Sequence, residues 1–340
     1  MAVLGLVSDL RLPGMDARRR ADQYGACLEQ VAWADRVGFG RVCLREHHGV
    51  PDGYLPSPLV LAGGVAAVTS SLTVVLQALV VTLHDPVRIA EDLAVLDLMC
   101  GGRLVVVVGA GYDRREHEMF GRSFGRRPAD VERAVGVLRR AWSGESFEFD
   151  GRPVCVRPLP YQDGGPPLLL GGTSAAAARR AARIADGFLP VRGRGYDTYR
   201  SAVLALGRPD PGPLPRSAPF SVHVAEDPER EWREIGPACL HESNAYAALA
   251  AASGLDTGFR AYPDVESLRA SGDYPILTPA ECVALCDELG DDGRVTFAPL
   301  VGGLDPDVAW RSLELIQRRV LPFVRARPDS PAGYRVSVAA

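Results

Sequence analysis

The feature that most constrains this chain is an alternation of short apolar runs with amphipathic stretches along its whole length. The apolar runs have the length of strands, and the stretches between them carry apolar residues at helical spacing. Eight runs are predicted to be strands: Val3–Ser8, Arg41–His47, Leu72–Thr82, Leu104–Val108, Pro167–Leu170, Gly187–Val191, Phe220–Ala225 and Val295–Leu300. Eight strand–helix units in 340 residues predict a (β/α)8 TIM barrel, with a doubly wound sheet as the alternative.

Other segments are predicted to be additions to this repeating pattern. The segment Gly144–Pro160 alternates around an Asp150-Gly151 turn, which is typical of an inserted hairpin. The stretch Ser253–Leu277 is predicted to be irregular and to lie near the mouth of the barrel, where loops vary most. The segment Asp305–Arg325 is predicted to be the closing helix. Since no linker interrupts the pattern, residues 1–340 are expected to form one barrel domain with insertions at the C-terminal strand ends.

Composition excludes several classes of protein. A formal net charge of −4 argues against a nucleic-acid partner, and no lysine is present, which excludes Schiff-base enzymes and Walker-type phosphate loops. The seven cysteines are scattered without paired spacing, so we expect no metal site. No run is apolar enough to span a membrane, and the first ten residues lack the basic start of a signal peptide. The sequence therefore predicts a cytoplasmic protein with reduced thiols.

The end of the second strand carries the best catalytic candidate. Alternation turns Val42 and Leu44 towards the helices and His47 towards the interior of the barrel, at the end where barrel enzymes place their chemistry. An interior histidine serves as a general acid or base, although a hydrogen-bonded structural histidine fits the pattern equally well. His48 must point the opposite way, so this pair alone is not expected to bind a metal ion.

Two more strand ends are candidates for ligand contacts. The fourth strand runs into Gly109, Ala110, Gly111 and Tyr112, where glycines allow close approach to a flat ligand and the tyrosine is either a stacking ring or a plain wall residue. The fifth runs into Gly171, Gly172, Thr173 and Ser174 and then directly into a helix. Free N–H groups and hydroxyls at a helix start favour a phosphate site, with an ordinary helix cap as the alternative.

Further segments share their order and spacing with one known family. They are Glu46-His47-His48, Leu83-His84-Asp85-Pro86-Val87-Arg88, the run from Asp97 to Leu104, Glu116 with Phe120-Gly121, and the run from Ala185 to Phe188. Together with the two glycine-containing strand ends, they resemble the bacterial luciferase-like family of flavin-dependent oxidoreductases. The resemblance covers nearly the whole chain.

This resemblance implies a homodimeric barrel that binds reduced flavin mononucleotide (FMN), supplied by a separate flavin reductase, and uses it to activate oxygen. His47 resembles the active-site histidine of the family. Gln77 and Ala78 match an unusual bulge that supports the isoalloxazine ring, although Gln77 replaces the small residue of luciferases. Gly172, Thr173 and Ser174 match the turn that binds the flavin phosphate.

A second departure from luciferases leaves the cofactor open. Ala110 stands where luciferases place an arginine on the flavin phosphate, which leaves that charge to backbone N–H groups or to an arginine such as Arg126 or Arg127. Family members with this Gly-Ala-Gly pattern include enzymes that use the deazaflavin coenzyme. The favoured interpretation is a two-component monooxygenase that uses reduced FMN and O2. The alternatives are a hydride-transfer oxidoreductase that uses the deazaflavin coenzyme, and a non-catalytic flavin-binding barrel.

The substrate is expected to be a small organic molecule. His241, Asn244 and Tyr246 lie in one helical stretch after the seventh strand and are predicted to face the substrate. An ordinary half-exposed helix face explains the same spacing.

Overall fold

The computed structural model describes residues 2–8, 10–254, 259–324 and 327–335. Its strands are β1 (Val3–Ser8), β2 (Arg41–Leu44), β3 (Thr73–Val80), β4 (Leu104–Gly109), β5 (Phe147–Phe149), β6 (Arg152–Val154), β7 (Leu168–Gly172), β8 (Gly187–Pro190), β9 (His223–Val224), β10 (Ile276–Leu277) and β11 (Arg294–Phe297). Its helices are α1 (Ala17–Arg36), α2 (Pro58–Val68), α3 (Pro86–Met99), α4 (Arg114–Met119), α5 (Arg127–Trp142), α6 (Ala175–Ile184), α7 (Tyr196–Ala205), α8 (Pro228–Ser253), α9 (Val265–Ser271), α10 (Pro279–Leu289) and α11 (Pro306–Arg319).

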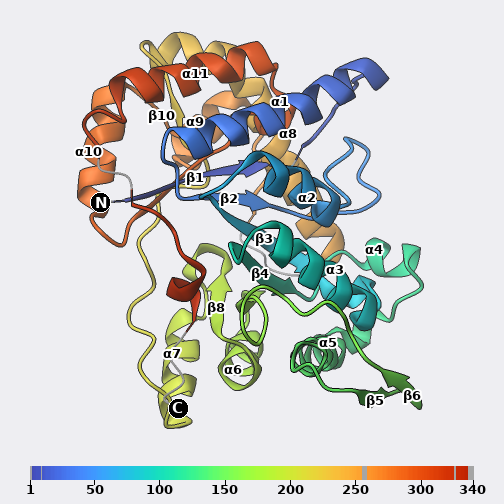
Figure 1. Cartoon of the computed structure of the whole chain (residues 1–340). Helices are drawn as coiled ribbons and strands as arrows, with labels where there is room; N and C mark the ends of the chain where they lie inside the picture. Colours follow the sequence, from blue (N-terminus) through green and yellow to red (C-terminus); the bar gives the residue numbers. More distant parts are fainter. Residues whose placement is uncertain (1, 9, 255–258, 325–326, 336–340) are drawn as a thin grey trace.

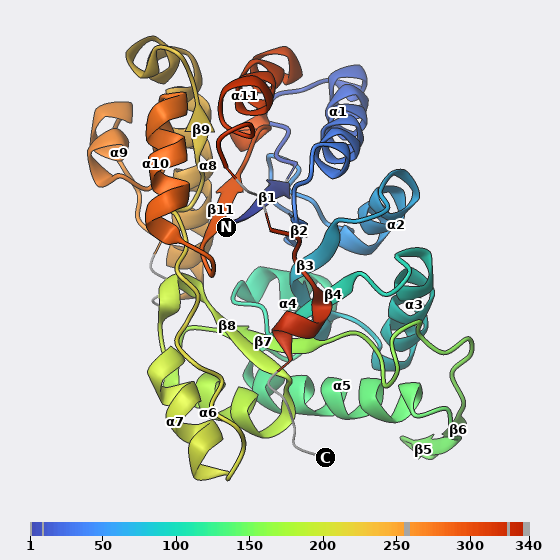
Figure 2. The same cartoon turned by 60° about the vertical axis from the view of Figure 1, so that its left-hand side comes forward.

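The main sheet has the strand order β11-β1-β2-β3-β4-β7-β8, and every pair in it is parallel. Neighbours in space are neighbours in sequence, and the last strand lies beside the first, so the sheet curls into a barrel with helices around it (Figures 1 and 2). A doubly wound sheet would instead reverse its strand order at a switch point. The (β/α)8 prediction is confirmed.

Two apolar layers follow from the alternation of side chains along the strands. Val42 and Leu44 join the large layer between sheet and helices, whereas Cys43 joins a smaller cluster inside the barrel with Val7 and Val75. The predicted facing of the second strand is therefore confirmed. This facing matters for the site, because the residues that follow β2 leave the sheet at the mouth of the barrel.

The capping residues and glycines expected at the ends of α3 have the predicted roles. The Asp85 carboxylate accepts hydrogen bonds from the N–H groups of Val87 and Arg88 at 2.9 and 3.1 Å, and Pro86 occupies the first turn. Beyond the helix, Gly101 and Gly102 both adopt positive φ and turn the chain into β4. The predicted hairpin is also present, as the antiparallel pair β5–β6.

Several predicted bounds are wrong. The second strand ends at Leu44 rather than His47, because the chain turns back so that the His47 N–H bonds the Leu55 carbonyl. The third strand ends at Val80 and continues as a 3-10 turn, and the closing helix ends at Arg319 rather than Arg325, which lies outside the described residues. Polar residues at these strand ends continue the alternation, so periodicity could not locate the turns.

The seventh strand differs most from the prediction. Only His223–Val224 of the predicted run Phe220–Ala225 is a strand, and it pairs with β10. Two single bridges, Ser217 to Arg294 and Val222 to Phe297, attach this part of the chain to β11. Among the described residues no ladder joins it to β8, so the barrel has a seam at this position.

The stretch Ser253–Leu277 was predicted to be irregular, but part of it is regular. It contains α9 and β10, and residues 255–258 lie outside the described part. Asp264 caps α9 by accepting the Ser267 N–H at 2.7 Å, and Gly272 ends it in the left-handed region. An aspartate before a helix and a glycine after it are helix-end signals, so both ends of α9 could have been predicted from the sequence.

Asp35 ties the end of α1 to the turn before β3, and its loss should destabilise the fold. Its carboxylate accepts the N–H groups of Ser70, Ser71 and Leu72 at 2.8–2.9 Å. Asp35→Ala should therefore lower the free energy of unfolding by about 1–3 kcal/mol at pH 7, as measured by urea denaturation. Asp22→Ala, on an exposed position of the same helix, is the control and should change little.

The effect of Asp35 should depend on pH. Burial raises the pKa of the carboxyl group, but the hydrogen bonds outweigh burial and lower this pKa from 3.8 to about 2. Because the folded pKa is depressed, the stabilisation is present above about pH 4 and is lost as pH falls towards 2. The gap between wild type and Asp35→Ala should narrow over this range, and a constant gap would contradict this account.

Candidate active site

His47 lies at the mouth of the barrel, where one connection holds both of its ring nitrogens. It follows β2, and its side chain is buried. Nδ1 lies 2.7 Å from Glu116 Oε1, and Nε2 lies 2.8 Å from the hydroxyl of Tyr112, both on the connection after β4. The same Glu116 oxygen accepts the His48 N–H at 2.9 Å. This arrangement selects the tautomer with a proton on Nδ1, which leaves Nε2 to accept the Tyr112 O–H.

Aromatic rings surround the His47 imidazole. Tyr54, Tyr112 and Tyr246 contact it edge-on, with ring centroids at 4.8, 5.0 and 6.4 Å. Burial raises the pKa of Tyr112 well above its ordinary value, so this phenol stays protonated and remains a donor to His47. The three groups Glu116, His47 and Tyr112 form a chain of hydrogen bonds, which we call the proton relay. Such a chain can move a proton between the buried carboxylate and the mouth of the barrel.

A second carboxylate organises the opposite side of the same strand end. Glu46 Oε1 bonds Nε2 of His48 and of His84, each at 2.9 Å, while Oε2 accepts the Val80 N–H at 2.6 Å. Burial raises the pKa of Glu46, but these hydrogen bonds outweigh it and lower the pKa to about 2. His47 and His48 thus point in opposite directions, as the alternation predicted.

Glu46, His48 and His84 also have the chemistry of a metal-binding group. Their ligand atoms all lie within 4.8 Å of one another, and the sequence analysis, which weighed only adjacent histidines, missed this group. In the structure both imidazoles are hydrogen-bonded to one carboxylate oxygen, and its other oxygen bonds the backbone of β3. This arrangement acts as a brace between the end of β2 and the end of β3.

The bulge expected at Gln77 and Ala78 is present. The register between β3 and β4 shifts there, the Gln77–Ala78 peptide is cis, and both residues are only half-buried. A Cβ on Gly109 would lie 3.0 Å from that of Ala78, and one on Gly111 would meet the His117 ring at 2.7 Å. A Cβ is therefore disfavoured where β4 passes the bulge, most strongly at Gly111, whose positive φ also favours glycine.

The loop after β4 is held by its own side chains. Thr82 Oγ1 donates to the Ala110 carbonyl at 3.0 Å, and Arg127 donates to the Gly111 carbonyl at 2.6 Å while its guanidinium stacks on Phe124. Arg127 is thus bound to backbone, and Arg126 lies 3.9 Å from Asp130.

The turn Gly171–Ser174 begins α6 as expected. The Ser174 hydroxyl accepts the Ala177 N–H at 3.2 Å, which makes it an ordinary helix cap. Ser174 is exposed, and the three residues before it, Thr173 among them, are half-buried. A ten-residue helix thus presents its positive end to solvent at the end of β7, which suits a phosphate group. Gly195 of the next loop lies beside the turn, with its Cβ position 3.7 Å from the Ser174 carbonyl.

The three residues predicted to face the substrate lie on α8, but each is bound to protein atoms. His241 Nε2 lies 2.9 Å from Asp52, and the Asn244 amide bonds the backbone N–H and carbonyl of Tyr262. The Tyr246 hydroxyl lies 2.7 Å from that of Tyr54. Of these, Tyr246 contacts His47.

Sequence analysis missed a buried ion pair beneath these residues. The Arg11 guanidinium lies between the rings of Tyr54 and Tyr246, 4.6 Å from each centroid, and donates to Asp52 at 2.6 Å. Burial raises the pKa of Asp52, but hydrogen bonds from His241 and Arg11 outweigh it and lower the pKa. The only hint in the sequence was a charged residue just after the first strand.

Comparison with known proteins identifies the family and agrees with the barrel fold. The profile described as luciferase-like monooxygenase matches residues 6–273. The chain belongs to the luciferase-like monooxygenase family. The crystal structure of the monooxygenase RslO1 from Streptomyces bottropensis matches with a TM-score of 0.76 and 24% identity, covering 94% of this chain and 99% of that one. The oxygenating constituent of the 3,6-diketocamphane monooxygenase from Pseudomonas putida, solved with FMN, matches with a TM-score of 0.73 and 19% identity, covering 96% and 100%.

Another relative uses a different coenzyme. An F420-dependent glucose-6-phosphate dehydrogenase of Kineococcus radiotolerans is 27% identical over 237 residues, which cover 61% of this chain and 67% of that protein. The chain spans less than half the length of the first curated relatives that it matches. The similar proteins thus include one solved with FMN and one that depends on the deazaflavin F420. No helix in the described part of the chain is long and apolar enough to cross a membrane.

The proton relay predicts the tautomer of His47. In the wild type, neutral His47 should carry its proton on Nδ1, which 15N NMR of the ring nitrogens can detect. Glu116→Gln removes the carboxylate and offers an amide that can donate to Nδ1, so the Nε2–H form should become populated. Glu118→Gln, two residues away and exposed, should leave the tautomer unchanged. An Nε2–H wild type would contradict the relay.

Proposed function

We propose that the chain is a two-component monooxygenase that takes reduced FMN from a separate flavin reductase and uses it with O2 on a small organic substrate. The observation that carries the proposal is the proton relay, in which His47 is held between Glu116 and Tyr112 at the mouth of a luciferase-like barrel. Two features on the same side of the barrel, the bulge of β3 and the open end of α6, suit the two ends of a flavin nucleotide.

The residues present fit this cofactor. The half-buried Gln77–Ala78 bulge and the glycines of β4 leave backbone, rather than side chains, facing the mouth, as a flat ring system requires. The N–H groups at Gly171–Ser174 would hold the phosphate, and no cationic side chain at position 110 is needed for that. When bound, reduced FMN would supply the electrons that activate O2.

The chain itself would supply proton control. With Nδ1–H held by Glu116, the Nε2 atom of His47 can accept a proton from the reaction centre or return it through the Tyr112 hydroxyl. The surrounding rings of Tyr54 and Tyr246 exclude water from the imidazole, which keeps the proton within the relay. We propose that the substrate side of the mouth is shaped by His241, Asn244 and Tyr246. They would do so by holding Asp52, Tyr262 and Tyr54 in place.

The second candidate function is hydride transfer with the deazaflavin coenzyme. It is favoured by the uncharged Ala110 and by the similarity to the F420-dependent dehydrogenase. In that reaction His47 Nε2 would exchange a proton with the substrate as hydride moves. A non-catalytic flavin-binding barrel is the third candidate, and the proton relay argues against it because storage needs no such chain.

Anaerobic titration with FMN and with F420, each oxidised and reduced, separates these candidates. The proposal expects the tightest binding for reduced FMN, followed by O2-dependent conversion of a member of a panel of small aldehydes, ketones and aromatic compounds. His47→Ala should keep FMN affinity and lower turnover by about 10²–10⁴-fold. His223→Ala, a buried histidine bound to Glu231, controls for general damage. Hydride transfer from reduced F420 without O2 would overturn the proposal.

We also propose that the protein pairs as a homodimer through α2 and α3. α2 carries no charged or strongly polar residue on any face, and its Val60 is 78% exposed. Beside it, Val95, Leu98 and Met99 of α3 are 41–50% exposed, and the two helices pack together (Figures 1 and 2). A helix that is apolar all round requires cover on its outer face, and a second copy would supply the same surface in return.

Light scattering after size-exclusion chromatography tests this pairing. Val60→Glu places a charge at the centre of the apolar surface and should raise the dimer Kd at least about tenfold, shifting the protein towards monomer. Leu204→Glu, an exposed apolar position on α7, is the matched control and should leave the mass unchanged. A monomeric wild type would refute the dimer.

A further inference from the structure

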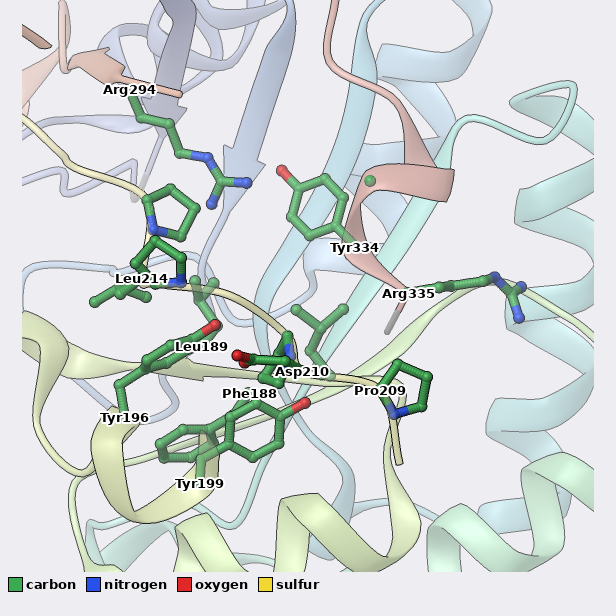
Figure 3. Close-up of a pocket in the computed structure, with 16 residues that line it drawn as sticks. Phe188, Leu189, Tyr196, Tyr199, Pro209, Asp210, Leu214, Arg294, Tyr334 and Arg335 are labelled. Carbon is green, nitrogen blue, oxygen red and sulfur yellow. The ribbon is translucent and has the colours of Figure 1, made fainter. Parts of the chain in front are cut away.

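The seam of the barrel contains a pocket that the proposed chemistry does not use. It has a volume of about 270 Å³ and lies between β8, α7, the loop Pro209–Pro215 and the segment that ends at Arg335 (Figure 3). Its strand residues include Leu169, Gly187 and Arg294, near the starts of β7, β8 and β11, together with Phe188 and Leu189 of β8. His47 follows the opposite, carboxyl end of a strand, so the two sites lie at opposite ends of the barrel.

Aromatic and apolar side chains line most of this seam pocket. Tyr196 and Tyr199 project from α7, and Tyr334 projects from the final described segment to the other side (Figure 3). Leu189 and Leu214 complete the walls. An apolar cavity of about 150 Å³ holds benzene, so the volume here suits a ligand with about two fused rings.

The charge in the pocket is positive. The Arg294 guanidinium lies over the Tyr334 ring, 5.1 Å from its centroid, and forms no ion pair within the described ranges (Figure 3). The carboxylate in the lining, Asp210, is already bound by both nitrogens of a bidentate Arg200 contact at 2.7 Å. An arginine without a carboxylate beside apolar walls favours an anionic ligand.

In the part of the chain that is described, the pocket wall also contains a hydroxyl without a hydrogen-bond partner, that of Tyr199. The Tyr199 side chain is almost fully buried, and its hydroxyl has no hydrogen-bond partner among the residues that the structure describes. Burial raises the pKa of Tyr199 and of Tyr334 to about 12, so both phenols are neutral at physiological pH, and the Tyr334 hydroxyl donates to the Asp329 carboxylate at 2.5 Å. The Tyr199 hydroxyl is itself sealed from the pocket, so Tyr199 and Tyr334 contribute their rings to its walls.

We propose that the seam pocket binds a small aromatic carboxylate, with its carboxylate against Arg294 and its rings between Tyr196 and Tyr334. The site is independent of the flavin chemistry, since none of its residues belongs to the proton relay or to the phosphate turn. Its walls come from both sides of the seam, so a bound ligand would join β8 to the chain segment that precedes β9.

Calorimetric titration with 2-naphthoate and with its uncharged analogue 2-naphthamide tests the proposal. The wild type should bind 2-naphthoate at least about tenfold more tightly than 2-naphthamide, and saturating FMN should not displace it. Arg294→Gln should abolish this preference, whereas Arg216→Gln, which removes an exposed arginine paired with Glu288, should preserve it. Thermal unfolding of each variant verifies that it has folded.

A filling variant keeps the test decisive if Arg294→Gln fails to fold. Leu214→Trp enlarges a wall residue at the pocket and should abolish 2-naphthoate binding while leaving FMN affinity unchanged. Absence of binding to the wild type, equal affinity for the two probes, displacement by FMN, or unaltered binding to Leu214→Trp would each overturn the proposal.

Discussion

The parallel hydrogen bonding of the main sheet is the constraint on which the rest of the structure depends. Because β1 pairs with both β2 and β11, and every ladder in this sheet is parallel, the carboxyl ends of its strands meet at one end of the barrel. Residues far apart in sequence are thereby brought to one place. His47 and Glu116 are 69 residues apart and share a hydrogen bond of 2.7 Å. The chemistry is assembled by topology rather than by any local motif.

Buried carboxylates then decide what each side chain at this end can do. Glu116 orients His47, Glu46 joins two further histidines to the β3 backbone, and Asp52 neutralises Arg11. Each is removed from water, so each needs several donors, and the donors it takes become fixed in return. Two neighbouring histidines therefore have different roles, since one is oriented by Glu116 towards the mouth and the other by Glu46 towards the strand edge.

Features that depend on local periodicity could be predicted from the sequence. The inward direction of Cys43 on β2 follows from two-residue alternation, although His47 lies beyond the end of that strand, and the cap at Ser174 follows from a strand that runs straight into a helix. Partners across the fold could not be predicted this way. Nothing near Glu116 or Asp52 in sequence indicates which loop each will meet, because the pairing depends on the curvature of the sheet and the paths of two loops.

The short seventh strand shows the same limit for the backbone. Alternation predicted Phe220–Ala225, but prolines in the loop before it and the late strand β10 decide which backbone groups pair. The resemblance to luciferases, by contrast, indicated the bulge at Gln77 and Ala78, which no periodic pattern reveals. A family pattern can carry such irregular features because they recur at the same place in related chains.

The seam also makes the stability of the barrel uneven. Strands β1 to β4 and β7 are held by ladders on both sides, whereas β8 is held by β7 alone within the described structure. Local opening of β8 breaks fewer hydrogen bonds than opening of β2 or β3, so its amide hydrogens should be the least protected of the main sheet, because the other edge, β11, also bonds residues 216–222. The loop that follows β8 lies against the Gly171–Ser174 turn, while His47 is supported by strands that are paired twice. The barrel can thus loosen at β8 while the strands that support His47 stay paired on both sides.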